Sequence, residues 1–69
     1  MSKSYDEYLI SLNEDILAAL KLLDKQPRKD KVLFIEDKDK RIVGSLTDGD
    51  IRRALIGGAA VNDKVATHM

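Results

Sequence analysis

Apolar residues recur at helical spacing in the first third of the chain, which predicts a helix between Ile16 and Leu23. Asn13 or Asp15 could cap its first free backbone N–H groups, and Pro27 excludes its continuation. Because the helix is apolar over more than half of its circumference, we expect it to pack on two sides. The apolar face consists of Ile16, Ala19, Leu20 and Leu23, broadened by Leu17 and Leu22.

Two strands and a tight connection are predicted next. Val32 to Ile35 is a continuous apolar run with β-branched residues, a pattern typical of a strand covered on both faces. The polar turn 37–40 leads to a second strand, Arg41 to Leu46, so the two form a hairpin. Gly44 within this strand indicates a bulge or a close backbone approach. An earlier short strand or extended segment is predicted from Glu7 to Ile10.

A second helix is predicted to begin at Thr47 or Asp48. Gly57-Gly58 supplies the left-handed residue that commonly ends a helix. The rest of the chain offers little beyond Val61 and Val65 as candidate anchors. The apolar face of the second helix consists of Ile51, Ala54 and Leu55.

The 69 residues are expected to form one domain, with a flexible N-terminus over residues 1–6. Residues 7–69 follow the order β-α-β-β-α, an α+β fold with two helices packed on a small sheet. A chain of this size buries only about 60% of the surface that its unfolded form exposes. With no cysteine and with His68 as the one histidine, the sequence offers no disulfide and no histidine cluster. We therefore infer that a second copy or a larger parent protein stabilises it.

Charge and hydropathy narrow the range of partners. Lys and Arg number 12, as do Asp and Glu, so the formal net charge is zero, unlike that of a general nucleic-acid binder. No apolar run approaches the roughly 20 residues of a membrane span. The segment MSKSYDEY also lacks the apolar core of a signal peptide. We expect a cytoplasmic protein that binds neither nucleic acid nor membrane.

The candidate chemistry lies within Gly44 to Arg53, where the second hairpin strand passes directly into the second helix. A helix N-terminus favours anions, because free N–H groups and the positive end of the dipole point outward. Thr47 adds a hydroxyl that can donate to a phosphate oxygen. Asp50 adds a carboxylate that can accept from two vicinal hydroxyls, such as those of a ribose. Gly49 leaves room for a ligand to approach the backbone.

The same spacing also has a purely structural interpretation. Thr47 and Asp50 are placed as in a capping box, where the N-cap hydroxyl bonds the N3 amide and the N3 side chain reaches back. Caps are common, so the spacing alone favours this interpretation. The two roles are compatible, since a capping Thr can turn its hydroxyl toward a ligand.

The segment resembles the Gly-x-x-Thr-x-x-Asp signature that joins the last strand and helix of CBS (cystathionine-β-synthase) domains. Residues 16–23 resemble the first helix of that family, 32–44 its strand, acidic turn and strand, and 65–69 its closing segment. The resemblance covers residues 7–69, a single CBS repeat and hence half of a paired module. Residues 47–53 are also similar to CBS domains placed ahead of sugar-phosphate nucleotidyltransferases or fused to sugar-phosphate isomerases.

The resemblance implies a regulatory module that binds an adenosine nucleotide and is not itself an enzyme. In the family the signature Thr contacts phosphate and the Asp holds the ribose hydroxyls, roles that fall on Thr47 and Asp50. Where the family often has Pro, this chain has Phe34, which alters the base pocket. Adenine would lie against backbone and apolar side chains at the positions of Ile10, Ser11, Leu12 and Phe34.

Charge at the junction bears on which nucleotide would bind. Asp48 places a carboxylate near any bound phosphate, and two like charges about 4 Å apart repel by roughly 4 kcal/mol at an effective dielectric constant of about 20. Arg53 or Arg52 could offset this repulsion by turning back toward the phosphate. We therefore expect AMP or ADP as the ligand, with ATP or S-adenosylmethionine as further candidates, and no required cofactor.

CBS repeats act in pairs, so the second repeat must come from homodimerisation or from the parent chain. Two copies related by a two-fold axis would bury their apolar helix faces against each other. The alternative function is a structural dimerisation domain with no bound ligand, which Asp48 and Phe34 favour. Catalysis is not expected, because the sequence has no metal cluster and no Ser or Cys nucleophile paired with a histidine.

Overall fold

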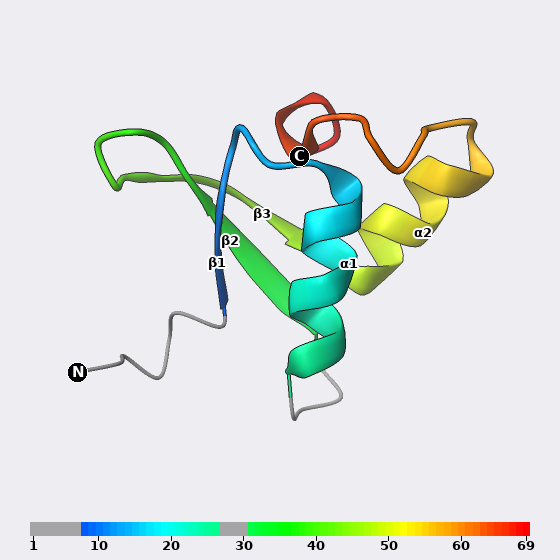
Figure 1. Cartoon of the computed structure of the whole chain (residues 1–69), viewed down its shortest axis with the longest axis horizontal. Helices are drawn as coiled ribbons and strands as arrows, with labels where there is room; N and C mark the ends of the chain where they lie inside the picture. Colours follow the sequence, from blue (N-terminus) through cyan, green and yellow to red (C-terminus); the bar gives the residue numbers. More distant parts are fainter. Residues whose placement is uncertain (1–7, 27–30) are drawn as a thin grey trace.

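The computed structural model describes residues 8–26 and 31–69, and their elements follow the predicted order (Figure 1). The predictions for residues 1–6, Glu7 and Pro27 lie outside the described residues. The fold is a small α+β domain with two helices and a three-stranded mixed sheet. The elements are β1 (Leu9–Ser11), α1 (Ile16–Lys25), β2 (Val32–Glu36), β3 (Ile42–Thr47), α2 (Asp48–Ile56) and the 3-10 turn η2 (Val65–Thr67).

The sheet has the order β1-β2-β3. β1 runs parallel to β2, with Ile10 opposite Ile35, and α1 forms the crossover that parallel strands require. β2 and β3 are antiparallel, which confirms the predicted hairpin. Its turn is closed by the Asp37 carboxylate, whose Oδ1 accepts from the amides of Asp39 at 2.8 Å and Arg41 at 3.0 Å.

The sequence predicts a bulge or a close approach at Gly44, and the structure shows both. The register shifts between Ile35 and Glu36, so Val43 is an extra residue beside Gly44. The Met69 sulfur lies 3.0 Å from the point that a Cβ on Gly44 would occupy. A Cβ at this position would require the Met69 side chain to move slightly.

Helix α1 begins at Ile16 as predicted, and of the two candidate caps, Asn13 and Asp15, it is Asp15 that forms the N-cap. The Asp15 side chain accepts from the Ala18 amide at 2.9 Å. After the helix, Gln26 is buried and bonds both the N–H and the C=O of Val32, at 3.2 and 2.8 Å. Leu17 is 43% exposed, so the second apolar side of this helix is covered only in part.

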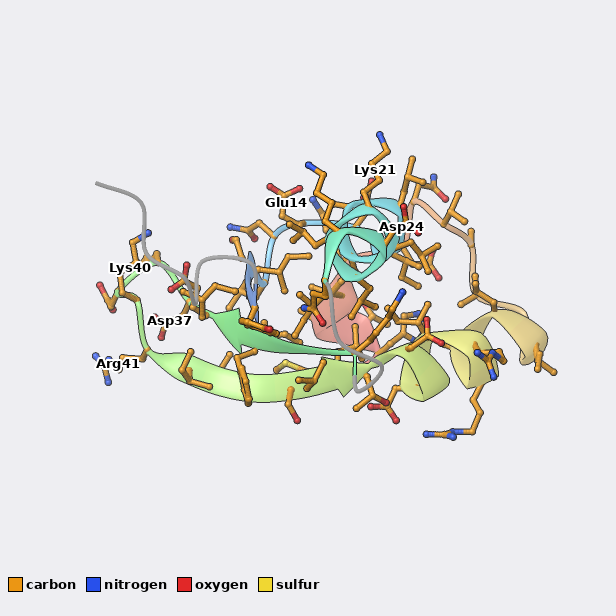
Figure 2. The ribbon with its side chains drawn as sticks, turned by 90° about the horizontal axis from the view of Figure 1, so that it is seen from below. Glu14, Lys21, Asp24, Asp37, Lys40 and Arg41 are labelled. Carbon is orange, nitrogen blue, oxygen red and sulfur yellow. The ribbon has the colours of Figure 1, made fainter. Side chains whose placement is uncertain are left out.

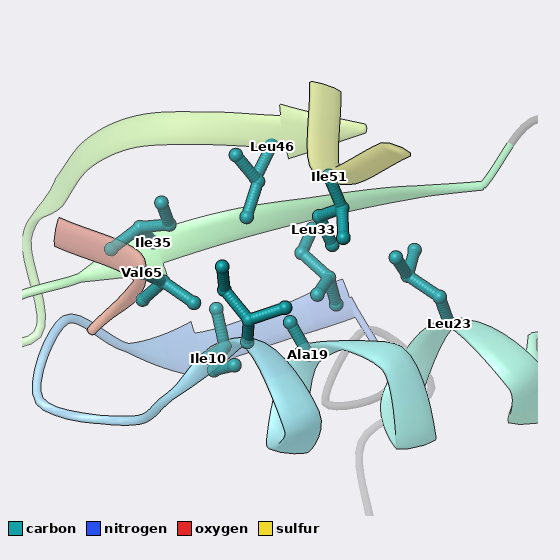
Figure 3. Packing of buried hydrophobic residues seen from close by; sticks show 9 residues of the cluster. Ile10, Ala19, Leu23, Leu33, Ile35, Leu46, Ile51 and Val65 are labelled. Carbon is teal, nitrogen blue, oxygen red and sulfur yellow. The ribbon is translucent and has the colours of Figure 1, made fainter. Parts of the chain in front are cut away.

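One hydrophobic core joins all the elements (Figure 3). The inner side of each helix packs inside the domain, where Ile16, Ala19 and Ile51 are at most 1% exposed. Burial of these helix faces between two copies stays a prediction, with the partly exposed apolar residues of the helices, such as Leu17, as the part that a second copy could cover. The core residues are Ile10, Ile16, Ala19, Leu23, Leu33, Ile35, Leu46, Ile51 and Val65.

The expectation that β2 is covered on both faces is also wrong for the described chain. Leu33 and Ile35 are buried, whereas Phe34 between them is 41% exposed. Helices α1 and α2 lie on one face of the sheet, and no described element covers the other (Figure 2). We call this second surface the open face; register and strand alternation place Leu9, Val32, Phe34 and Ser45 on it.

Among the described helices, none combines the length and the apolar character that crossing a bilayer demands.

Candidate functional site

The candidate site is the junction where β3 ends at Thr47 and α2 begins at Asp48. Thr47 is the N-cap and keeps an extended backbone. Its hydroxyl accepts from the Asp50 amide at 3.1 Å, and its own amide donates to Asp50 Oδ2 at 2.9 Å. The structural interpretation of this spacing is confirmed, because the capping box is complete.

The second oxygen of the Asp50 carboxylate is also occupied. Arg53 Nη2 donates to Asp50 Oδ1 at 2.6 Å. The hydrogen bonds from Thr47, first the one to its backbone, lower the pKa of Asp50 from its ordinary value, and Arg53 adds to this effect. The carboxylate is therefore charged at neutral pH, and a hydroxyl donor would have to share its oxygens with Thr47 and Arg53 or displace Arg53.

Both arginines of α2 turn back toward its first turn. Arg52 Nη2 lies 2.8 Å from Asp48 Oδ2, so Asp48 and Asp50 each have a guanidinium partner. These are surface ion pairs, with arginine side chains 70% and 72% exposed, and pairs of this kind contribute little to stability. The two arginines neutralise the carboxylates of the first turn of α2, and breaking either ion pair costs little free energy.

Gly49 makes room for one of these arginines. A Cβ on Gly49 would lie 3.4 Å from Arg53 Nη1 and 3.8 Å from Thr47 Oγ1. In the free chain the space that the sequence assigns to a ligand is therefore partly filled by the Arg53 guanidinium.

The residues expected around adenine do not share one surface. Ile10 is 3% exposed in the core, and Leu12 packs against that core. Ser11 and Phe34 lie on the open face, because Ser11 alternates with Ile10 and Phe34 with Leu33 and Ile35. Phe34 pairs with Ser45, two residues before Thr47 on the same face of β3. The open face thus leads from Phe34 toward the junction, whereas the Ile10 side chain has no access to it.

A hollow that sequence reasoning missed lies on the helix side of the sheet. Its volume is about 380 Å³, and of the predicted site residues it includes Asp48 alone. Two lysines and two aspartates line it, so its charges balance. Periodicity gave no signal for it, because it combines one side of α1, labelled at Lys21 and Asp24 in Figure 2, with Lys31 just before β2 and Asp48 at the start of α2. The lining residues are Leu20, Lys21, Leu23, Asp24, Lys31 and Asp48.

The described ranges 8–26 and 31–69 bring together no three His, Cys, Asp or Glu side chains as a metal-ligand set. The one histidine, His68, instead lies with Nε2 3.3 Å from Asp63 Oδ2. The Ala60 amide and His68 lower the pKa of Asp63 from its ordinary value.

Comparison of the chain with protein-family models, with curated proteins and with solved structures gives no match in any of the three.

Proposed function

We propose that the chain is one CBS-type repeat of a paired regulatory module that binds an adenosine nucleotide at the β3–α2 junction. The observation that carries the proposal is the direct passage of a strand into a helix N-terminus, with the Thr47 hydroxyl and the Asp50 carboxylate held together there. Helix amino ends attract phosphate, and an ionised carboxylate accepts from ribose hydroxyls. The proposal includes a cytoplasmic location and no catalytic activity.

Phosphate binding would draw on the arginines that now pair with carboxylates. A phosphate at the first turn of α2 competes with Asp50 for Arg53, and the exposed ion pair offers little resistance. Release of Arg53 would leave Asp50 Oδ1 free for a ribose hydroxyl. Because Asp48 remains close by, the proposal favours AMP or ADP over ATP. A sugar-phosphate nucleotidyltransferase is the proposed parent enzyme.

The second repeat is proposed to come from a second copy or from the parent chain. The open face offers an apolar surface for such pairing, because no described element covers it and Phe34 is 41% exposed there. It continues to the junction through Ser45 and Thr47. A paired repeat on this face would enclose the ligand site from the side that is now open.

Thermal unfolding with and without AMP tests the ligand. AMP at about 100 times its dissociation constant should add about 2.7 kcal/mol to the free energy of unfolding. For so small a domain each 1 kcal/mol raises the midpoint by about 4–8 °C. Asp50→Asn should abolish this shift. Asp39→Asn in the hairpin turn makes the same charge change away from the junction and should retain it. A full shift in Asp50→Asn would contradict the proposed ribose contact.

A structural dimerisation domain without a ligand remains the second candidate. The observation that favours it is that Thr47 and Asp50 already satisfy each other in the capping box. It predicts no thermal shift with millimolar AMP, ADP, ATP or S-adenosylmethionine, while sedimentation still shows a dimer.

A further inference from the structure

The C-terminal segment Ala60–Met69, which we call the strap, crosses the amino end of α1 (Figure 1). The first N–H groups of a helix have no carbonyl partner within the helix. Here Asp63 O accepts from the Ile16 amide and Val61 O from the Leu17 amide, both at 2.9 Å. In return the Val65 amide donates to Glu14 O at 2.9 Å. The strap therefore completes the cap that Asp15 begins.

One side chain anchors the strap in the core. Val65 is fully buried and lies beside Ile35 and Ile10 in Figure 3. Val61 is 46% exposed and Met69 52% exposed, and no other strap residue is fully buried. The other attachments of the strap are backbone hydrogen bonds, the Lys64 Nζ that donates to Asn13 O at 2.7 Å, and the half-exposed Met69 beside Gly44. Because each ordered residue costs conformational entropy, a segment with one buried apolar anchor is held more weakly than the sheet.

The strap is joined to α2 through Gly57, Gly58 and Ala59, whose amides donate to carbonyls of the last turn of the helix at 3.0–3.1 Å. Gly57 is the C-cap of α2, and Gly58 has a φ of +110° with no atom within 4 Å of the point that a Cβ would occupy. Glycine reaches either sign of φ without steric cost, so the backbone can change direction here at the expense of the contact that Ala59 makes with the core.

We propose that the strap is a conformational device of this fold, which undocks from α1 as a unit about Gly57-Gly58 while the sheet and both helices stay folded. Undocking frees the Ile16 and Leu17 amides and removes Val65 from the core. Because most strap side chains face solvent, a partner that binds them shifts the docking equilibrium and with it the stability of the amino end of α1.

Amide hydrogen exchange of the full chain, followed by NMR, tests the proposal. In the wild-type protein the Ile16, Leu17 and Val65 amides should share one opening equilibrium and exchange about tenfold or more faster than the bonded amides of the β2–β3 hairpin. Val65→Ala should accelerate the Ile16 and Leu17 amides by a further factor of about ten or more. Hairpin amides that exchange by global unfolding should accelerate by the same factor, because Val65 leaves the core in both openings. The matched control is Val61→Ala, which removes an exposed side chain from the same strap and should change neither set.

Equal exchange of strap and hairpin amides in the wild-type protein would overturn the proposal, and this comparison does not depend on any variant folding. A second test is Leu46→Ala in β3, a core residue outside the strap that should stay buried when the strap undocks. It should accelerate the hairpin amides by about tenfold or more and leave the Ile16 and Leu17 amides unchanged. Equal acceleration of both sets by Leu46→Ala would overturn the proposal, because the strap would then open only when the whole domain unfolds.

Discussion

Thr47 is the residue on which fold and proposed function meet most closely. Its hydroxyl caps α2 by accepting from the Asp50 amide, and the same oxygen is the proposed phosphate contact. Loss of an N-cap side chain costs about 1 kcal/mol, so Thr47→Ala should lower the free energy of unfolding by that amount. Urea denaturation measures the change. Thr47→Ser keeps the hydroxyl and should lose less than half as much; an equal loss in both variants would contradict the cap.

The carboxylates of Asp50 and Asp63 predict how stability depends on pH. Hydrogen bonds lower the pKa of both from an ordinary value of 3.8. A carboxyl whose folded pKa lies below its unfolded value adds stability above the unfolded pKa, and this is lost as the pH falls through the folded pKa. The urea midpoint should therefore drop below about pH 4, and the drop should be smaller in Asp50→Asn. A midpoint that is independent of pH in this range would contradict the assignment.

Lys40 in the hairpin turn has an unfavourable backbone conformation. It has a φ of +67°, a left-handed conformation that disfavours side chains with a Cβ. Lys40→Gly should raise the free energy of unfolding by about 0.5–1 kcal/mol, measured by urea denaturation. Lys38→Gly in the same turn is the control and should give no gain, since its φ is not positive.

At the scale of elements, periodicity predicted the helices and the hairpin because their side chains repeat along one face. The Asp15 cap, the start of α2 and the glycine end follow from single residues in the same way. The strap could not be predicted so fully, because two of its contacts use the backbone carbonyls of Val61 and Asp63, which any residue carries. In the same way, the continuous apolar run of β2 does not reveal whether other elements of the chain cover both faces of that strand.

The open face makes a prediction about pairing. Phe34→Glu places a charge in the middle of this face and should convert a dimer to a monomer that remains folded, since Phe34 is not part of the core. Sedimentation velocity would measure the oligomeric state, and circular dichroism would show whether the monomer stays folded. Leu17→Glu on the helix side has similar exposure and should leave the dimer intact. A dimer that survives Phe34→Glu would exclude the open face as the pairing surface.

At the scale of the whole molecule, the domain is one sheet with helices on a single side. The sequence was enough to place Thr47, Asp48, Gly49, Asp50 and Arg53 at one junction, because they are neighbours in the chain. It could not reveal that Ile10 faces the core and Phe34 the open face, because this depends on which side the helices cover.

The central claim is that an adenosine nucleotide binds at the β3–α2 junction. A titration of the ¹⁵N-labelled chain with AMP, followed through its amide NMR resonances, tests it most directly. We predict saturable shifts that are largest for the amides of Thr47 to Ile51. Shifts confined to the hollow beside Lys21 and Asp24, or no shifts at millimolar AMP, would contradict the claim.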